Sequence, residues 1–360
     1  MPKKARIVIG SNYGDEGKGT VVAHYTKNSV GTVLNILTNG GAQRGHSILT
    51  EDGNITFKHF GSGTYHGADS YYSRFFILNP MQFVSEYESL IVKPKNIYRD
   101  INCRWSTPYD IMANLITENL MGRKASCGMG IWNTVKRYQE MPTILFDDFI
   151  DSSNQREYLN GVRAYYNKLI GNIPSEWKKV WDSEMLQEHF INDCNFVHDN
   201  TTLVWGMSDL EYYDNLIFEN GQGLLLCDTG KDTYDTTPSN TGSLYASELL
   251  FGLKDFDVTA HYVTRPYLTR HGDGGMEDEH DRDVISAGVN EDRTNHYNNN
   301  QGAFRYGNLN LFKLKKRIDR DNGGKFKIEL DITHCDEMDR VAEFSRVFDK
   351  VNVYDNPLIK

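Results

Sequence analysis

The sequence has few of the features that mark secreted, zinc-binding and membrane-spanning proteins. Its 360 residues include only five cysteines, an odd number without CxxC spacing, so neither a disulfide framework nor a zinc cluster is expected. No apolar run is long enough for a signal peptide or a bilayer span. Positive charge is also scarce, because 39 Lys and Arg stand against 49 Asp and Glu, a formal net charge of −10. We therefore expect a cytoplasmic protein that binds neither nucleic acid nor membranes.

The sequence does contain enough apolar material for a large core, with 39% hydrophobic and 24% charged residues. Residues 5–10 predict a buried central strand that runs into a glycine-rich loop, and residues 32–37 predict a second strand. Strand, loop, helix and strand in this order indicate an α/β fold with a parallel sheet. Ligands gather at the carboxyl ends of such strands, so the loops that follow them are the candidate sites.

The first of these loops, residues 11–20 (Ser-Asn-Tyr-Gly-Asp-Glu-Gly-Lys-Gly-Thr), is suited to binding a phosphate. Gly14, Gly17 and Gly19 allow backbone N–H groups to turn toward anionic oxygens, and Lys18 adds a positive charge. The helix expected after the loop would present its N-terminus to the same anion. The loop is not a Walker A motif, because that motif needs a hydroxyl residue directly after the lysine.

Asp15 is unusual in a phosphate loop, because its charge repels the ligand unless it binds a metal or acts as a base. With it, the loop resembles the signature loop of the adenylosuccinate synthetase family, ligases that join aspartate to a 6-oxopurine nucleotide. It is most similar to the phage branch that makes N6-succino-2-amino-2'-deoxyadenylate from dGMP, which would place it in a host cytoplasm. The resemblance implies a P-loop-like α/β fold with a mainly parallel central sheet. It also implies one domain over residues 1–360, with a helical insertion at about 151–214.

A second glycine-rich turn ends in Gly-His-Ser, and the family has Gly-His-Thr there. The resemblance implies that Asp15 is the catalytic base and that His46 is the acid that stabilises the transferring phosphoryl group. Without that context, a surface-turn histidine is the plainer interpretation of His46. In the same way, Asp15 and the carbonyl of Gly45 would hold Mg²⁺. Residues 42–44 (Ala-Gln-Arg) replace the family's His-Asn-Ala, so Gln43 stands where an asparagine touches the nucleotide.

The resemblance assigns three sets of binding residues. The donor triphosphate would bind to Asn12, Gly14, Glu16, Gly17, Lys18, Gly19, Thr20, Gly45, Ser47 and Asp331. The acceptor nucleotide would bind to Asp15, Gln43, Ser126, Cys127, Arg137, Gln222 and Thr237. Aspartate would bind to Arg305, Gln301 and Asn300, with Asn299 beside them.

Two of these assignments involve further reasoning. Ser126 and Cys127 replace two threonines that receive the nucleotide's 5'-phosphate, and a thiol donates weakly, so Ser126 is favoured. Arg137 matches an arginine that reaches the partner's substrate phosphate across a homodimer. A basic pair on the surface is the alternative for Arg137.

The predicted donor follows from two departures from the family pattern. The guanine-reading motif Thr-Lys-Leu-Asp appears as Ile-Glu-Leu-Asp, so Glu329 replaces the lysine that packs on guanine, while Asp331 is retained. The sequence given also lacks the family's terminal Gly-Pro segment. Both changes favour ATP or dATP over GTP.

The resulting prediction is an ATP-dependent, Mg²⁺-using ligase that joins L-aspartate to C6 of dGMP. An adenylosuccinate synthetase that acts on IMP with GTP is the alternative within the family. A nucleotide-binding switch or ATPase without ligation is the alternative of another class. That alternative gives no reason for His46, Gln222 and Thr237 to recur in the family's order.

Overall fold

The computed structural model describes residues 2–51, 53–122, 126–227, 236–289, 292, 297 and 300–354. Its centre is β1 (Lys3–Gly10), an apolar strand with buried side chains on both faces. Such a strand needs a neighbour on each edge. β1 pairs in parallel with β11 (Asn215–Gly223) on one side and β12 (Phe256–Thr264) on the other. The predicted strand at residues 5–10 is therefore central, as expected.

Within the described residues the main sheet has nine strands, in the order β10-β8-β6-β2-β11-β1-β12-β16-β17, and every pairing is parallel. The other members are β2 (Val33–Leu37), β6 (Asp69–Tyr72), β8 (Ile97–Asp100), β10 (Thr202–Val204), β16 (Lys327–Thr333) and β17 (Val351–Tyr354). This confirms the α/β fold with a parallel central sheet. The first two strands of the chain are not neighbours, because β11 lies between β1 and β2.

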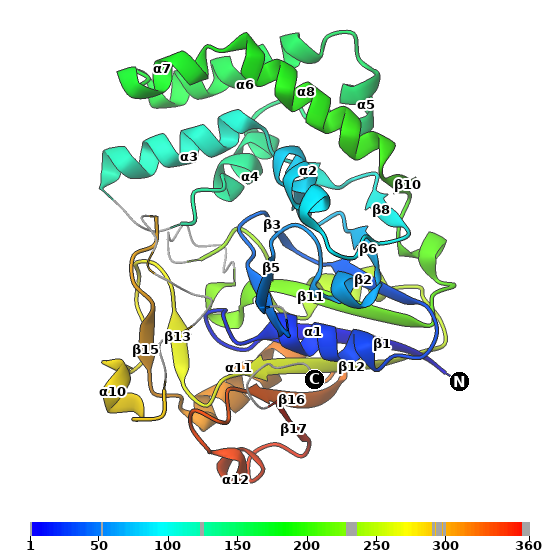
Figure 1. The fold of residues 1–360 in the computed structure, drawn as a ribbon, viewed down its shortest axis with the longest axis vertical. Helices are drawn as coiled ribbons and strands as arrows, with labels where there is room; N and C mark the ends of the chain where they lie inside the picture. The colour runs from blue at the N-terminus through cyan, green and yellow to red at the C-terminus, as the bar shows by residue number, and fades with distance from the viewer. Residues whose placement is uncertain are drawn as a thin grey trace.

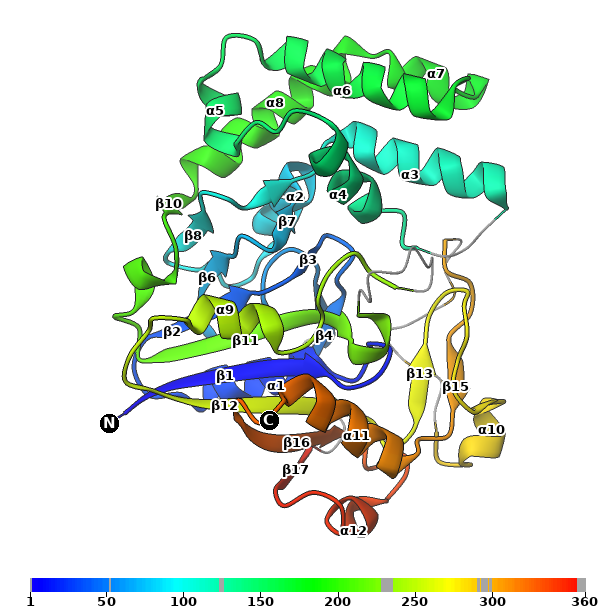
Figure 2. The ribbon, with the colours of Figure 1, turned by 180° about the vertical axis from the view of Figure 1, so that it is seen from behind.

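Helices cover both faces of the sheet, as parallel sheets require. On one face lies α1 (Lys18–Lys27), whose Val21 and Val22 pack against the strands (Figure 1). On the other face lie α9 (Leu244–Leu250) and α11 (Leu311–Asn322) (Figure 2), which contribute Leu249 and Leu314 to the main core.

A helical layer lies at the top of both views (Figures 1 and 2). It comprises α2 (Pro80–Ser89), α3 (Pro108–Met121), α4 (Ile131–Glu140), α5 (Phe146–Asp151), α6 (Gln155–Ile170), α7 (Ser175–Trp181) and α8 (Glu184–Asp199). Its side chains form a second core around Trp105. The helices predicted at about 151–214 are α6 to α8, but they end at residue 199, because β10 returns the chain to the main sheet.

Smaller elements extend the carboxyl end of the main strands. They are a parallel sheet of β3 (Gly40–Gly41), β7 (Phe76–Leu78) and β9 (Arg104–Trp105), a hairpin of β4 (His46–Thr50) and β5 (Gly53–Phe57), and an antiparallel sheet of β13 (Leu268–Arg270), β15 (Arg305–Gly307) and β14 (Glu279–His280). The remaining helices are η1 (Ser62–His66), η2 (Met207–Leu210), η3 (Leu224–Leu226), α10 (Arg282–Ile285) and α12 (Val341–Phe344). None of the helices in the described part of the chain has the length and apolar character needed to cross a bilayer.

Candidate active site

The phosphate loop connects β1 to α1, as the sequence predicts. Its last residue, Gly17, has φ +86° and would place a Cβ 3.0 Å from Thr333, so the position requires glycine. Thr333 also donates its Oγ1–H to the carbonyl of Glu16 at 2.7 Å. These contacts fix the loop against the carboxyl end of β16. The first N–H groups of α1 have no acceptor within the helix and can bind an anion.

Glu16 is held by its own loop. Its Oε1 accepts the backbone N–H groups of Asn12 at 2.8 Å and Gly14 at 2.9 Å, and its Oε2 lies 3.2 Å from Lys18 Nζ. The assignment of Glu16, Asn12 and Gly14 to the donor triphosphate stays a prediction. In this structure the backbone N–H groups of Asn12 and Gly14 bind the carboxylate of Glu16, in the way that they would bind a phosphate oxygen.

Asp15 has a left-handed backbone, with φ +58°, and Arg265 donates its Nε–H to the Asp15 carbonyl at 2.8 Å. Arg265 is itself held by Asp292, 2.6 Å from its Nη2. Burial raises the pKa of the Asp15 carboxyl, against the lowering effects of His271, Lys18 and Arg265. A raised pKa favours proton acceptance near neutral pH, the property that a general base needs.

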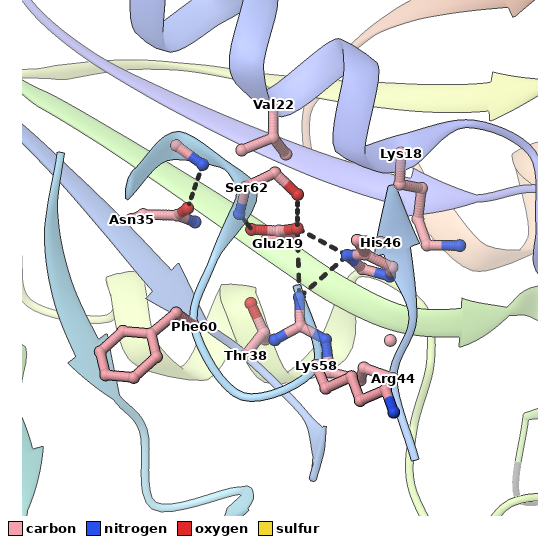
Figure 3. A network of polar contacts seen from close by, with 12 residues as sticks. Lys18, Val22, Asn35, Thr38, Arg44, His46, Lys58, Phe60, Ser62 and Glu219 are labelled. Atoms are coloured by element: carbon pink, nitrogen blue, oxygen red, sulfur yellow. Dashed lines mark hydrogen bonds and ion pairs between the residues drawn. The ribbon is translucent and has the colours of Figure 1, made fainter. Parts of the chain in front are cut away.

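His46 and Glu219 form the second half of the site (Figure 3). His46, the first residue of β4, places its Nδ1 2.5 Å from Oε1 of Glu219 near the end of β11. Ser62 donates its backbone N–H and its hydroxyl to the same carboxylate, at 3.0 and 2.7 Å. Arg44 approaches that carboxylate to 3.3 Å. His46 is thus part of a buried network, and the surface-turn interpretation does not hold.

Charge and burial act in opposite directions on this pair. Burial, followed by the positive charge of Arg44, lowers the pKa of His46 to about 4 despite the hydrogen bond to Glu219. Burial opposes ionisation of Glu219, but Arg44, His46 and Ser62 outweigh it and lower the pKa of Glu219 to about 2. The resting network is therefore a neutral imidazole beside a carboxylate and a guanidinium.

The two predicted loops meet. A Cβ on Gly19, in the first turn of α1, would lie 2.7 Å from the carbonyl oxygen of Ser47 and 3.2 Å from the carbonyl carbon of His46. Close backbone approach therefore requires glycine at position 19. The hydroxyl of Ser47 lies 2.8 Å from that of Thr56 in β5, so its side chain links the two strands of the β4–β5 hairpin.

Gln43 and Gln222 lie around Gly40. A Cβ on Gly40 would lie 3.0 Å from Nε2 of Gln43 and 3.5 Å from Oε1 of Gln222. Both amide atoms of Gln43, and Oε1 of Gln222, are buried without a hydrogen-bond partner in the described part of the chain. Such atoms are rare in folded proteins and mark places where a ligand or water binds.

Five more predicted residues lie outside the helices and strands. Asn300 donates its Nδ2–H to the carbonyl of Cys127 at 3.2 Å, which brings the predicted aspartate loop to the predicted 5'-phosphate loop. Ser126 contacts Asn114 at 3.3 Å, and burial raises the pKa of the Cys127 thiol to about 11. Thr237 donates its N–H to Leu226 at 2.9 Å. Gln301 follows Asn300 and is half-buried, and Asn299 lies outside the described residues.

Arg137 does not have the predicted position. Its guanidinium is 2% exposed and bonds to Asp110 at 2.8 and 3.0 Å, to the Trp105 carbonyl at 3.1 Å and to the Tyr158 hydroxyl at 3.0 Å. The side chain holds the helical layer together, so it cannot reach a nucleotide on another subunit. The position of Arg137 therefore gives no support for a homodimer.

Arg305 and Asp331 are also engaged within the chain. Arg305 pairs with Glu279, 2.7 Å from its Nε, and donates to the carbonyls of Gly272 and Gly274 at 2.9 Å each. Little of its donor capacity is left for a bound aspartate. The role of Arg305 in aspartate binding stays a prediction, and it would require Arg305 to exchange some of these partners.

Asp331 has no exposed surface. Its carboxylate accepts hydrogen bonds from Tyr25 at 3.2 Å, Asn352 at 2.8 Å and Tyr354 at 3.2 Å, and lies 3.0 Å from His261 Nδ1. A base could bond to it only after displacing one of these donors. Beside this network is a cavity of about 510 Å³, between α1 and strands β1, β12, β16 and β17.

The comparisons with known proteins agree with this geometry. A family model described as adenylosuccinate synthetase matches residues 7–345. The chain belongs to the adenylosuccinate synthetase family. Curated members are 26% identical over 288 residues in Geotalea uraniireducens and 25% identical over 288 residues in Haemophilus influenzae, covering 76% and 77% of this chain. The chain spans only 64% and 65% of the length of those two adenylosuccinate synthetases.

Two solved structures in the family share the fold. The fully ligated adenylosuccinate synthetase of Plasmodium falciparum has a TM-score of 0.70 and 21% identity, covering 93% of this chain and 78% of its own. The succinoaminodeoxyadenylate synthetase of cyanophage S-2L, bound to dGMP and to dATP as an energy donor, has a TM-score of 0.69 and 13% identity. That likeness covers 99% of this chain and 94% of the cyanophage chain. At these identities the likenesses establish the fold of the adenylosuccinate synthetase family and no more.

Three site residues were not predicted from the sequence. Glu219 is the partner of His46, Arg265 supports Asp15, and His271 is the group whose charge acts most strongly on the Asp15 carboxyl after burial. Glu219 lies near the carboxyl end of β11, and Arg265 directly follows β12. His271 directly follows β13, the next strand along the chain. That position was the available signal, because ligands of parallel sheets gather there.

Proposed function

We propose that the chain joins L-aspartate to C6 of a 6-oxopurine nucleotide, with dGMP as acceptor and ATP or dATP as phosphoryl donor. The observation that carries the proposal is the apposition of two loops at the end of the central sheet. One loop carries Asp15 and Lys18 at the N-terminus of α1. The other carries His46, whose ring is hydrogen-bonded to Glu219. Phosphoryl transfer needs little more from a protein than positioned groups of this kind.

The reaction then has two steps. The Asp15 carboxylate takes the N1 proton, and O6 attacks the γ-phosphorus, releasing ADP and forming a 6-phosphoryl nucleotide. Lys18 and His46 stabilise the charge that develops on the transferring group. The amine of aspartate next attacks C6 and phosphate leaves, so the products are the succinylated nucleotide, ADP and phosphate. His46 is neutral at rest, and we infer that it takes up a proton when the phosphates bring negative charge to its face.

Mg²⁺ fits the donor atoms that remain at the site. No group of three or more His, Cys, Asp or Glu in the described part of the chain could hold a metal alone. Mg²⁺ is usually held by one or two carboxylates together with substrate phosphates, and Asp15 with the carbonyl of Gly45 meets that need. When bound, the ion would neutralise charge on the phosphates.

Two observations support dGMP over IMP. The unpaired carbonyl oxygens of Gln43 and Gln222 are acceptors, and guanine offers an amino group that hypoxanthine lacks. The likeness to the cyanophage enzyme bound to dGMP also extends over nearly the whole of both chains. The curated relatives from Geotalea, Geobacter and Haemophilus carry the name adenylosuccinate synthetase, so IMP with GTP is the alternative.

The proposed preference for ATP or dATP rests on the cavity beside Asp331. Glu329, one of its lining residues, accepts a hydrogen bond from Asn352 and pairs with Lys350. Glu329 stands where the family's motif has the lysine that packs on guanine, and its carboxylate can accept from the exocyclic amine of adenine. The cavity lies beside Tyr25 of α1, about 10 Å along the helix from Lys18 at a rise of 1.5 Å per residue. A nucleotide with its phosphates at Lys18 could therefore extend its base toward this cavity.

The test is product mass and phosphate release after mixing the protein with Mg²⁺, ATP, aspartate and either dGMP or IMP. We expect a succinylated product from dGMP, with little from IMP. The reverse preference would assign the chain to the IMP reaction. Hydrolysis of ATP that does not depend on aspartate, without a succinylated product, would refute ligation. Asp15→Asn and His46→Ala are the matched controls, and each should lower the rate about 10²–10⁴-fold.

A further inference from the structure

Arg44 is a buried arginine at a position where the family pattern has alanine. It lies in the turn between β3 and β4, directly before Gly45 and His46, and its side chain is only 1% exposed. Its Cγ packs so closely over Gly221 and Gly40 that a Cβ on either would come within 3.2 and 3.5 Å of it. Taking a guanidinium out of water costs several kcal/mol unless a charge compensates it. Such a residue therefore needs a specific partner.

The partner of Arg44 is Glu219. Nη2 of Arg44 lies 3.3 Å from Oε1 of Glu219 and 3.1 Å from Nδ1 of His46, and Figure 3 shows the three groups converging. The same Oε1 accepts from His46 and from the hydroxyl of Ser62. Nε and Nη1 of Arg44 have no hydrogen-bond partner among the residues described. Its polar contacts are thus concentrated on the His46–Glu219 pair.

This geometry constrains the imidazole ring. A guanidinium can only donate, and an ionised carboxylate can only accept. Nδ1 of His46 lies 2.5 Å from Oε1 of Glu219, which can only accept, so the ring proton lies on Nδ1. Nη2 of Arg44, 3.1 Å from Nδ1, cannot donate to a protonated nitrogen, so Arg44 acts on the pair through its charge beside the carboxylate. The ring is then held on one edge and directs Nε2 away from Glu219. Ser62 holds the carboxylate of Glu219 with two hydrogen bonds, and Arg44 adds the positive charge that compensates it beside the ring. Without Arg44 the carboxylate would lose that charge, and the ring would lose part of its support.

We propose that Arg44 is a positioning residue for phosphoryl transfer, which fixes Glu219 and, through it, the orientation and tautomer of His46. This inference rests on the proposed function for its kinetic consequence, but not for its structural one. It assigns a role to a residue that is absent from the predicted binding sets. The competing explanation is that Arg44 only stabilises the fold, as a buried ion pair elsewhere does.

Kinetics separate the two explanations. Arg44→Ala should lower kcat about 10²-fold, the effect of a misplaced group, and change KM for either nucleotide less than threefold. Arg44→Lys keeps the charge without the planar fork and should recover part of the rate. Guanidinium ion at low millimolar concentration should restore kcat to Arg44→Ala and not to the wild type. Arg99→Lys is the control, because Arg99 is equally buried and bonds to Asp147 at 2.9 and 2.8 Å, far from the site. It should lower the melting temperature and leave kcat unchanged.

The ring is observed directly by ¹⁵N NMR of labelled histidine at pH 7.5, on the full chain without ligands. The wild type should show His46 with its proton on Nδ1, and Arg44→Ala or Arg44→Lys should show a mixture of tautomers. An unchanged tautomer, or an Arg44→Ala enzyme with kcat within twofold of the wild type, would overturn the inference. If the wild type ligates neither nucleotide, the proposed function fails, and the NMR result still decides the role of Arg44.

Discussion

Nε of Arg265 donates a hydrogen bond of 2.8 Å to the carbonyl oxygen of Asp15, joining the end of β12 to the phosphate loop. It meets Asp15 where φ is +58°, a left-handed conformation that costs a non-glycine residue roughly 1–2 kcal/mol. Asp292 and Tyr267 hold the other nitrogens of Arg265, at 2.6 and 3.2 Å. Arg265 thus stabilises the strained backbone of Asp15. Because Asp292 and Tyr267 fix the guanidinium, a movement of the loop would break its hydrogen bond to Asp15.

Arg265→Lys tests this anchor. Lysine keeps a positive charge for Asp292 but loses the directed Nε–H, so the Asp15 backbone is released. We expect kcat to fall about 10–100-fold, with a smaller change in KM, in steady-state assays of aspartate ligation. Arg99→Lys is the matched control, because Arg99 is also a buried arginine paired with a carboxylate, Asp147, and three strands of the main sheet separate β8 from β1. Equal losses in both variants would show that Arg265 has only a general structural role.

Glu219→Gln tests the partner of His46. The amide has nearly the shape of the carboxylate, but it removes the charge that Arg44 and the ring require and presents an N–H on one side. We expect kcat to fall about 10²–10³-fold, measured as phosphate release in the presence of aspartate. A variant that retains more than a third of the wild-type rate would show that the carboxylate is not needed.

The same pair predicts how stability depends on pH. The pKa of His46 in the folded chain, about 4, lies below its ordinary 6.5, so the unfolded chain binds a proton more readily as the pH falls. This contribution to stability is complete above pH 6.5 and is lost between 6.5 and 4, by about 3 kcal/mol. Glu219, with a pKa of about 2 against an ordinary 4.5, adds stability that is complete above 4.5 and is lost between 4.5 and 2. Urea unfolding at pH 7.5, 6 and 5 measures the upper window. His46→Gln should reduce the slope in that window, to which His59 and His334 also contribute because burial lowers the pKa of each. An unchanged slope would contradict the assignment.

Gly61 predicts a steric effect on the site. A Cβ at this position would lie 2.0 Å from Oδ1 of Asn35 and 2.8 Å from Oε2 of Glu219. Gly61→Ala should therefore displace the carboxylate, lower the free energy of unfolding by about 2 kcal/mol and lower ligation at least tenfold. In the control Gly161→Ala, in α6, the new Cβ meets only Met141, at 3.4 Å, and helix propensity favours alanine by up to about 1 kcal/mol. Calorimetry and initial rates compare the two, and equal activity of both variants would contradict the prediction.

The sequence located the site where local pattern determines structure. Glycines in the 11–20 loop and the Gly45-His46 turn follow strands of one parallel sheet, so their meeting follows from topology. The partners of these loops could not be predicted, because they depend on packing between distant segments. Glu219 has the pattern of an ordinary strand residue, and only the fold brings it to His46, 173 positions earlier.

The contacts of three predicted site residues were unforeseen for the same reason. Arg137 and Arg305 are arginines in motifs that bind anions in the family, yet each meets a carboxylate of its own chain first. Asp331 keeps its place in the motif, but Tyr25 and Asn352 close over it. Residue type and spacing show which chemistry is possible. They do not show which neighbouring group each side chain bonds to in the folded chain.

The position of β1 in the sheet has a consequence for synthesis. This strand is made first and carries the phosphate loop, but both of its neighbours, β11 and β12, follow more than 200 residues later. At 5–20 residues per second the ribosome needs roughly 10–50 s to supply them. During that interval β1 has neither of its native neighbours, and the loop has neither Thr333 nor Arg265 to hold it. We therefore expect the phosphate loop to reach its final conformation only after both segments have left the exit tunnel.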